Sequence, residues 1–538
     1  MPRSRSSSGV HSLLVAAGIL LSRLAGLARE QVFAHFLGNS GPAGAFKAAL
    51  RIPNFLQNLF GEGVLSASFI PVYSRLLAEG EEELAGRVAG AVGAVLALGV
   101  GALALLGVVA TPLLVDVVAP GFSGPVRDLT VEIVRILFPG TGLLVLSAWC
   151  LGVLNSHRKF FLSYVAPVLW NAAMIATLLA FGGRRTQGQL AVLLAWGMVL
   201  GSALQLGFQL PFVFRHGRTI RFALATGLAP VREVFKNLGP VVGGRGVVQV
   251  SAFIDGMIAS FLGAAAVSGL AYAQTLYFLP ISLFGMSVAA AELPGMASST
   301  GTPDEIAAAL RERLARSLRR VAFFVIPTVA AFLLLGDLLV AALFQTGKFR
   351  ADDSLYVAYL LAGSTVGLLA ACLGRLYSSA FYALRDTRTP FRIAIARVAL
   401  TAALGWLFAF PLRPYFVASL RALGLPIPHV GGGELALGGV GLTASAGIAA
   451  WIEFLLLRRA LGRRIGKVAL AASFQLRAWG AALAGGLAAW ALRPALAHLA
   501  IPGHAGTIAR AALAAAVFGV MYLGLGEVFG LRRRMTAG

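Results

Sequence analysis

Charged residues are scarce in this chain of 538 residues. Asp, Glu, Lys and Arg make up 12% of it, about half of their usual share in soluble domains. A soluble protein of this length needs more polar side chains to cover its surface, so an ordinary cytosolic enzyme is excluded. Cysteine is nearly absent as well. Cys150 and Cys372 lie inside apolar runs without CxxC spacing, which excludes a disulfide scaffold and indicates small core residues without a redox or metal role.

Apolar residues are abundant instead, at 58% of the chain with a mean hydropathy of +0.82. This composition predicts an all-α polytopic membrane protein. If one span and its connection take roughly 35–40 residues, with about 20 of them in the hydrocarbon, the chain accommodates about 14 spans. The apolar runs place them at 11–37, 45–76, 84–117, 127–154, 160–182, 188–214, 236–262, 268–297, 318–344, 354–382, 390–411, 436–459, 471–492 and 508–530. The first run resembles a signal peptide, but Arg23 and Arg29 lie soon after its apolar stretch and no small-residue cleavage site is well placed. We therefore expect a retained helix.

The net charge of +23 is explained by membrane orientation rather than by nucleic-acid binding. Loops after even-numbered spans are rich in arginine, whereas the odd loops 38–44 and 263–267 carry no charge; the ninth loop, with Lys348 and Arg350, is a partial exception. The positive-inside rule then places both termini in the cytoplasm.

The chain also repeats itself. Phe36-Leu37-Gly38 precedes Leu59-Phe60-Gly61, and the same letters recur at nearly the same spacing in Phe261-Leu262-Gly263 and Leu283-Phe284-Gly285. Both copies begin at odd-numbered spans, which predicts two six-helix lobes in parallel repeat. The predicted parts are an N-lobe at 1–216, a cytoplasmic linker at 217–235, a C-lobe at 236–467, and spans 13–14 with a basic tail at 468–538.

Ionisable residues inside predicted spans are expensive and are therefore candidate site residues. Arginine is suited to phosphate through its fork of N–H donors. The predicted anion-binding arginines of a central cleft are Arg23, Arg29, Arg51, Arg245 and Arg375. The predicted cleft acids, for gating or ion coupling, are Glu30, Glu62, Asp255 and Glu292. Several have a plainer interpretation: Glu30 shares a helix face with Arg23 and would neutralise it, and Arg51 and Arg375 would snorkel to an interface.

Three residues are candidate hinges, namely Gly26, Pro53 and Pro280. No P-loop and no HExxH motif occurs in the sequence. We therefore expect no ATP hydrolysis, no catalytic residues, no metal and no cofactor. A membrane potential, or coupling to Na⁺ or H⁺, is left as the energy source.

Several motifs resemble one known family. They are Ser22-Arg-Leu-Ala-Gly-Leu-Ala-Arg-Glu30, Arg51-Ile-Pro-Asn54, Leu59-Phe-Gly-Glu-Gly-Val-Leu-Ser-Ala-Ser-Phe-Ile-Pro71, Ala119-Pro-Gly-Phe122, Leu343-Phe-Gln-Thr-Gly-Lys-Phe349 and Asp386-Thr-Arg-Thr-Pro390. Together they resemble the MurJ (MviN) family of lipid II flippases, of the MOP exporter superfamily. The resemblance implies two six-helix lobes plus two C-terminal helices, and translocation of an undecaprenyl-pyrophosphate-linked peptidoglycan precursor to the outer leaflet. It also implies a monomer in the bacterial inner membrane that serves the peptidoglycan synthesis machinery.

Carried over by position, the family's essential arginines of the first span are Arg23 and Arg29, and Glu62 and Arg375 match its acidic and basic positions in spans two and ten. The chain departs from the pattern at Gly44, Gln57 and Thr275, where the family often has an acid and two arginines. Three alternatives stay open: a flippase for another lipid-linked saccharide, a cation-coupled drug exporter of the same superfamily, and a non-transporting cell-wall scaffold.

Overall fold

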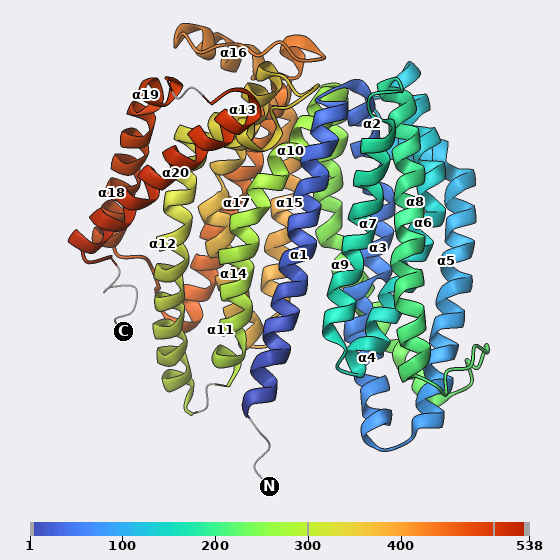
Figure 1. The fold of residues 1–538 in the computed structure, drawn as a ribbon. Coiled ribbons are helices and arrows are strands. Elements are labelled where there is room, and N and C mark those ends of the chain that lie inside the picture. The colour runs from blue at the N-terminus through green and yellow to red at the C-terminus, as the bar shows by residue number, and fades with distance from the viewer. Residues whose placement is uncertain (1–4, 299–300, 499–500, 532–538) are drawn as a thin grey trace. The chain divides into compact units, whose positions relative to one another are not determined.

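The computed structural model describes residues 5–298, 301–498 and 501–531, and every regular element in these ranges is helical (Figure 1). For residues 5–16, 19, 62, 64 and 239–252 it gives the helical backbone only. Local sequence explains several helix starts. Thr186 and Thr302 each form a capping box with the residue three positions on, and proline occupies the first turn of α2, α6, α9, α12 and α16.

By packing, the chain divides into two compact units, Met1–Ala264 and Ala265–Gly538. The helices of the first unit are α1 (Arg5–Leu37), α2 (Gly41–Ala49), α3 (Arg51–Phe60), α4 (Glu62–Ala78), α5 (Glu82–Val118), α6 (Gly124–Ser156), α7 (Phe160–Phe181), α8 (Gln187–His216) and α9 (Ala229–Phe261). Helix α6 is the most buried of the apolar helices in this unit and packs against α2, α3, α4, α5 and α8. Helix α1 packs on α7, and α9 packs on α3, α4 and α5.

The second unit is helical in the same way. Its elements are α10 (Ala264–Pro280), the π-helix η1 (Ile281–Met286), α11 (Ser287–Ala297), α12 (Pro303–Phe344), α13 (Ala351–Thr365), α14 (Leu368–Ala383), α15 (Arg388–Ala409), α16 (Arg413–Ala422), the short 3-10 helix η2 (Gly433–Leu435), α17 (Gly438–Ile465), α18 (Ala472–Ala491), α19 (Arg493–Ala497) and α20 (Gly503–Val528). Helices α12 and α17 are its centre, because α13 and α14 pack on both of them and α18 and α20 pack on α12.

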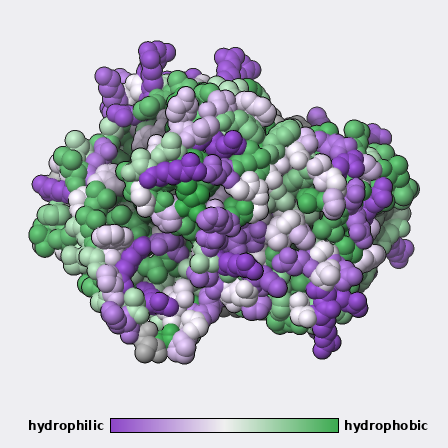
Figure 2. All heavy atoms as spheres, turned by 90° about the horizontal axis from the view of Figure 1, so that it is seen from above, coloured by the Kyte–Doolittle hydropathy of each residue, from purple (hydrophilic) through white to green (hydrophobic). Residues whose placement is uncertain are grey.

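This is a multi-pass membrane protein. Within the described ranges, nine helices are long and apolar enough to cross a membrane, and the bent pair α13–α14 makes ten. Each of the fourteen predicted spans coincides with a helix or a broken run of helices, but the count of fourteen spans stays a prediction. Hydrophilic side chains stand among hydrophobic ones on the face seen from above in Figure 2.

The turns that suggested the internal repeat have matching local structures. Gly38 follows the end of α1 with φ 59°, and Gly263 follows the end of α9 with φ 103°, a conformation that favours glycine. The second pair of motifs marks a distortion in both units: Gly61 separates α3 from α4, and Gly285 lies in η1. These agreements support the repeat.

A third pair of turns matches in backbone geometry although its sequences differ. Arg158 after α6 and Arg385 after α14 have φ angles of 59° and 58°. Each residue's N–H donates to the carbonyl three residues back, Asn155 in one case and Tyr382 in the other, and both N···O distances are 2.9 Å. Since left-handed φ is rare outside glycine, this shared turn is further support for the repeat.

The structure can be compared with the predicted domain boundaries and the predicted hinge residues. The packing boundary at 264/265 assigns α9 to the first unit, whereas the predicted lobes follow the repeat and begin the C-lobe at 236; those lobes stay a prediction. Pro53 lies in the first turn of α3, just after the break between α2 and α3, and Pro280 ends α10 where the π-helix begins. Helix α1 runs unbroken through Gly26 (Figure 1), so the hinge role of Gly26 stays a prediction.

Candidate functional site

The α1–α2 hairpin of the first unit builds the most highly charged buried cluster described here. After α1 ends, the turn at 38–40 reverses the chain, and Ser40 caps α2 by accepting a hydrogen bond from the Ala43 N–H at 3.3 Å. Glu30 lies eight residues before Gly38 and Lys47 nine residues after it. At 1.5 Å per residue, Glu30 lies about 12 Å before Gly38 and Lys47 about 10 Å after Ser40, so the hairpin brings the two residues to similar levels, where their side chains are in contact.

Glu30 is held by two cations. Its Oε1 accepts a hydrogen bond from Arg29 Nη2 at 2.8 Å, and its Oε2 accepts one from Lys47 Nζ at 2.5 Å. Glu30 and Lys47 are each 8% exposed. A buried carboxylate of this kind needs such partners to offset its lost hydration.

Aromatic rings complete the surroundings of the two cations. The Arg29 guanidinium carbon lies 4.8 Å from the centre of the Trp170 ring on α7, and Lys47 Nζ lies 4.3 Å from the centre of the Phe33 ring. Phe33 also packs on Phe46, with ring centres 5.5 Å apart. Cation–π contacts fix both charged groups where few water molecules reach them.

The sequence interpretation of Glu30 is therefore corrected. The sequence analysis offered Arg23, on the same face of the helix, as the partner of Glu30. In the structure, Glu30 forms its ion pairs with Arg29 and Lys47. Lys47 was missed altogether. Its residue type could have indicated it, because burying a lysine in the apolar run 45–50 costs as much free energy as burying the arginines that were selected.

Arg51 belongs to a second, half-buried site between α3 and α9. Its guanidinium occupies the space where a side chain at Gly256 would stand, and Asp255 is its electrostatic partner. Phe55 and Phe253 pack edge to face beside them, with ring centres 5.2 Å apart. The structure thus brings two predicted residues of opposite charge, Arg51 on α3 and Asp255 on α9, near each other.

The remaining predicted residues are dispersed or not described. Arg23 is exposed on α1, Arg375 is exposed on α14, and Glu292 is half-buried on α11. The side chains of Arg245 and Glu62 lie outside the described residues. Arg23 and Arg29 are six residues apart, and 100° per residue places them about 120° apart around α1. Among the described residues, no group of three His, Cys, Asp or Glu side chains is arranged to hold a metal ion.

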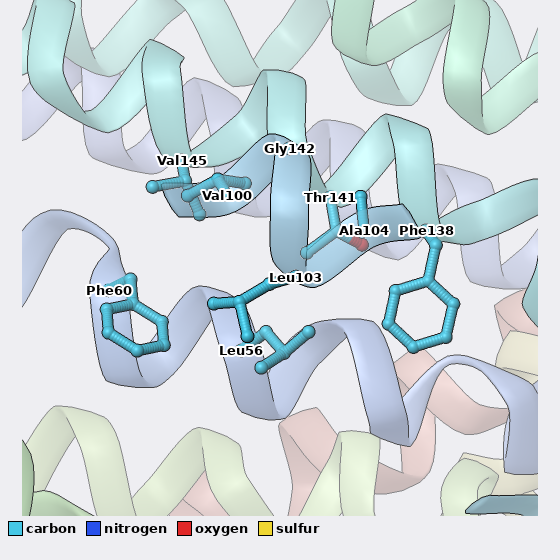
Figure 3. Close-up of a pocket in the computed structure, with 9 residues that line it drawn as sticks. All are labelled: Leu56, Phe60, Val100, Leu103, Ala104, Phe138, Thr141, Gly142 and Val145. Carbon is cyan, nitrogen blue, oxygen red and sulfur yellow. The ribbon is translucent and has the colours of Figure 1, made fainter. Parts of the chain in front are cut away.

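A small apolar pocket lies between α3, α5 and α6 (Figure 3). Leu56 and Phe60 face residues of α5 and α6 across it, among them Leu103 and Phe138. The Thr141 hydroxyl in its lining donates to the Leu137 carbonyl at 3.1 Å. With its polar group satisfied internally, this pocket offers nothing to an anion.

Comparisons with known proteins relate this sequence and its fold to one family. A family model described as lipid II flippase MurJ matches residues 33–425. The lipid II flippase MurJ of Burkholderia cenocepacia is 31% identical over 84% of this chain and 84% of its own, and the probable lipid II flippase MurJ of Haemophilus influenzae is 30% identical over 75% of this chain and 81% of its own.

Solved structures agree in fold. Lipid II flippase MurJ in an inward closed conformation superposes with a TM-score of 0.73 at 21% identity, covering 96% of this chain and 98% of that one. An inward-facing multidrug resistance MATE family transporter of the MOP superfamily gives a TM-score of 0.61 at 18% identity, covering 84% and 98%. The family match spans most of the chain, and the relatives are covered over most of their length, so this chain belongs to the lipid II flippase MurJ family.

Proposed function

We propose that this protein is a flippase that moves lipid II from the cytoplasmic to the outer leaflet of the bacterial inner membrane by alternating access. The observation that carries the proposal is membership of the MurJ family over residues 33–425. The chemistry of the first unit supports it. Arg29 is held at the helix surface by Trp170 and Glu30, and among the described contacts Glu30 is its hydrogen-bond partner, which leaves N–H donors for phosphate oxygens.

In this mechanism Arg29 binds the diphosphate of the substrate from the cytoplasmic side, Arg23 joins it when α1 bends at the predicted hinge Gly26, and the isoprenoid tail stays in lipid. The two units then exchange inward-open and outward-open arrangements. No nucleotide motif is present in the sequence, so the membrane potential is the proposed energy source. It acts on charge at about 2.3 kcal/mol per elementary charge per 100 mV. The coupling to Na⁺ or H⁺ is a second route, through Glu30, Glu62, Asp255 or Glu292.

A cation-coupled drug exporter is the second candidate, because a multidrug transporter of the MOP superfamily shares the fold. Such a site favours acids for cationic substrates. The cluster described here has two cations for one carboxylate, which favours an anionic substrate.

The test is complementation. A bacterium depleted of its own lipid II flippase should grow and keep its shape when it expresses this chain. Failure to rescue at normal protein levels in the membrane would refute the proposal, and efflux of cationic dyes by the same cells would support the second candidate.

A further inference from the structure

The buried cluster on the α1–α2 hairpin has a balance of charge that depends on Lys47. Arg29 and Glu30 are neighbours in sequence and hydrogen-bond to each other, so by themselves they form a neutral pair. Lys47 adds a second cation on the opposite carboxylate oxygen. The three side chains together carry one net positive charge.

Each carboxylate oxygen of Glu30 contacts a different cation. Lys47 Nζ occupies Oε2, and Arg29 Nη2 reaches Oε1 only. Without Lys47, the guanidinium would be drawn into a two-oxygen contact with Glu30, because a fork of N–H donors matches a carboxylate. That contact would use the donors and the charge that a diphosphate requires.

Lys47 itself is poorly placed to bind the substrate directly. It is 8% exposed, lies over the Phe33 ring at 4.3 Å and donates to Glu30. Arg29 has a more accessible side chain, at 17%. The two cations thus have different roles.

We propose that Lys47 is a positioning residue of the anion site: by neutralising Glu30 at the oxygen that Arg29 does not contact, it keeps the cluster net positive and the Arg29 donors available for a diphosphate. This inference rests on the proposed function. It makes the cluster a three-residue unit in which the lysine acts through the carboxylate and not by touching the substrate.

The experiment compares four full-length variants for binding of lipid II by the purified protein, with accumulation in the membrane and thermal unfolding in detergent as folding controls. Lys47→Met should weaken binding about tenfold or more, since one partner of a buried charge pair is removed. Lys47→Arg should bind close to the unaltered protein. Glu30→Gln should bind as tightly or more tightly, because the cluster gains net positive charge.

The double variant Lys47→Met/Glu30→Gln separates the roles. Removal of both charges leaves Arg29 as the one cation of the cluster, so binding should return to within about threefold of the unaltered protein. A double variant as weak as Lys47→Met would overturn the inference, as would a silent Lys47→Met. If Lys47→Met alone does not accumulate, binding by the double variant decides in the same way. Failure of the unaltered protein to bind lipid II would count against the proposed function instead.

Discussion

At the scale of the residue, one glycine controls where a half-buried arginine lies. A side chain at Gly256 would overlap the Arg51 guanidinium beside Asp255. The overlapping group is the end of a long flexible side chain, so the backbone need not move. A substitution should therefore displace the Arg51 guanidinium from its place near Asp255 without unfolding the protein.

Gly256→Ala should accordingly reduce rescue of the depleted bacterium to the level of Arg51→Ala, while membrane accumulation stays normal. The control is the double variant Arg51→Ala/Gly256→Ala, which should be no worse than either single variant because both act through the same contact. Strictly additive losses would show that Gly256 matters for a reason other than Arg51.

At the scale of the element, Asp386 explains a motif that the sequence analysis recognised by resemblance only. Its carboxylate accepts hydrogen bonds from the Thr389 hydroxyl at 2.7 Å and from the Arg388 and Thr389 N–H groups at 3.0 Å, so it caps the start of α15. It also pairs with Arg464 at the end of α17, at 2.6 Å. One side chain thus joins two helices of the second unit.

Asp386→Ala should lower the free energy of unfolding by about 1 kcal/mol or somewhat more, as loss of a helix cap does; Asp386→Asn, which keeps an acceptor, should cost less. The hydrogen bonds from the Thr389 side chain and backbone lower the pKa of Asp386 below its usual 3.8. Its contribution is therefore present above that value and is lost as the pH falls through the lowered pKa. Thermal unfolding in detergent across this range should show the mutant and the unaltered protein converge at acid pH. A constant difference would contradict the assignment.

The C-terminal helices are docked on α12 by a small number of polar contacts. Arg493 donates to both carboxylate oxygens of Asp337, at 2.6 and 2.9 Å, and to the Leu334 carbonyl at 2.6 Å. The Tyr522 hydroxyl donates to the Phe323 carbonyl at 2.6 Å. These contacts lie at separate levels along α12 and fix α18–α20 against it.

Arg493→Ala should destabilise the docking by about 1 kcal/mol, a modest effect because both side chains are partly exposed. The exchange Arg493→Asp/Asp337→Arg should recover much of it. The two predicted lobes are complete before Lys467 and do not need the helices that follow, so we expect those helices to guide the lipid tail. Deletion of everything after Lys467 should then leave an inserted protein that does not rescue. Protease accessibility of the C-terminal segment and complementation measure the two effects, and full rescue by the truncated protein would refute the guiding role.

Sequence reasoning was strongest where one physical rule governs a whole element. Long apolar runs located the helices, and Pro53 and Pro280 marked interruptions because proline removes a helical donor. It was weakest for contacts between elements. Periodicity along α1 gave Glu30 the partner Arg23, but the partner Lys47 comes from α2 through a turn whose geometry no spacing rule supplies. Asp255 and Arg51 were each selected, yet their pairing became visible only when α9 was seen to pack on α3.

At the scale of the whole molecule, topology is the first property to test. Reporter fusions near Arg218, Arg316 and Arg463 should report the cytoplasm, and fusions near Asn39, Asp352 and Gly432 the outside. Four arginines lie in or near odd loops and run against the positive-inside rule, namely Arg184, Arg185, Arg413 and Arg421. If fusions near Arg316 and Asp352 report the same side, the fourteen-span topology is wrong.

The central claim is that the buried, positively charged hairpin cluster serves a lipid-linked diphosphate. The most direct measurement is the exposure of lipid II on the outer leaflet of flippase-depleted cells that express this chain or its Arg29 variants at equal levels. We predict exposure with the unaltered chain, none with Arg29→Ala, and a partial signal with Arg29→Lys, since an ammonium keeps the charge but not the fork of donors. Full exposure with Arg29→Ala would contradict the account.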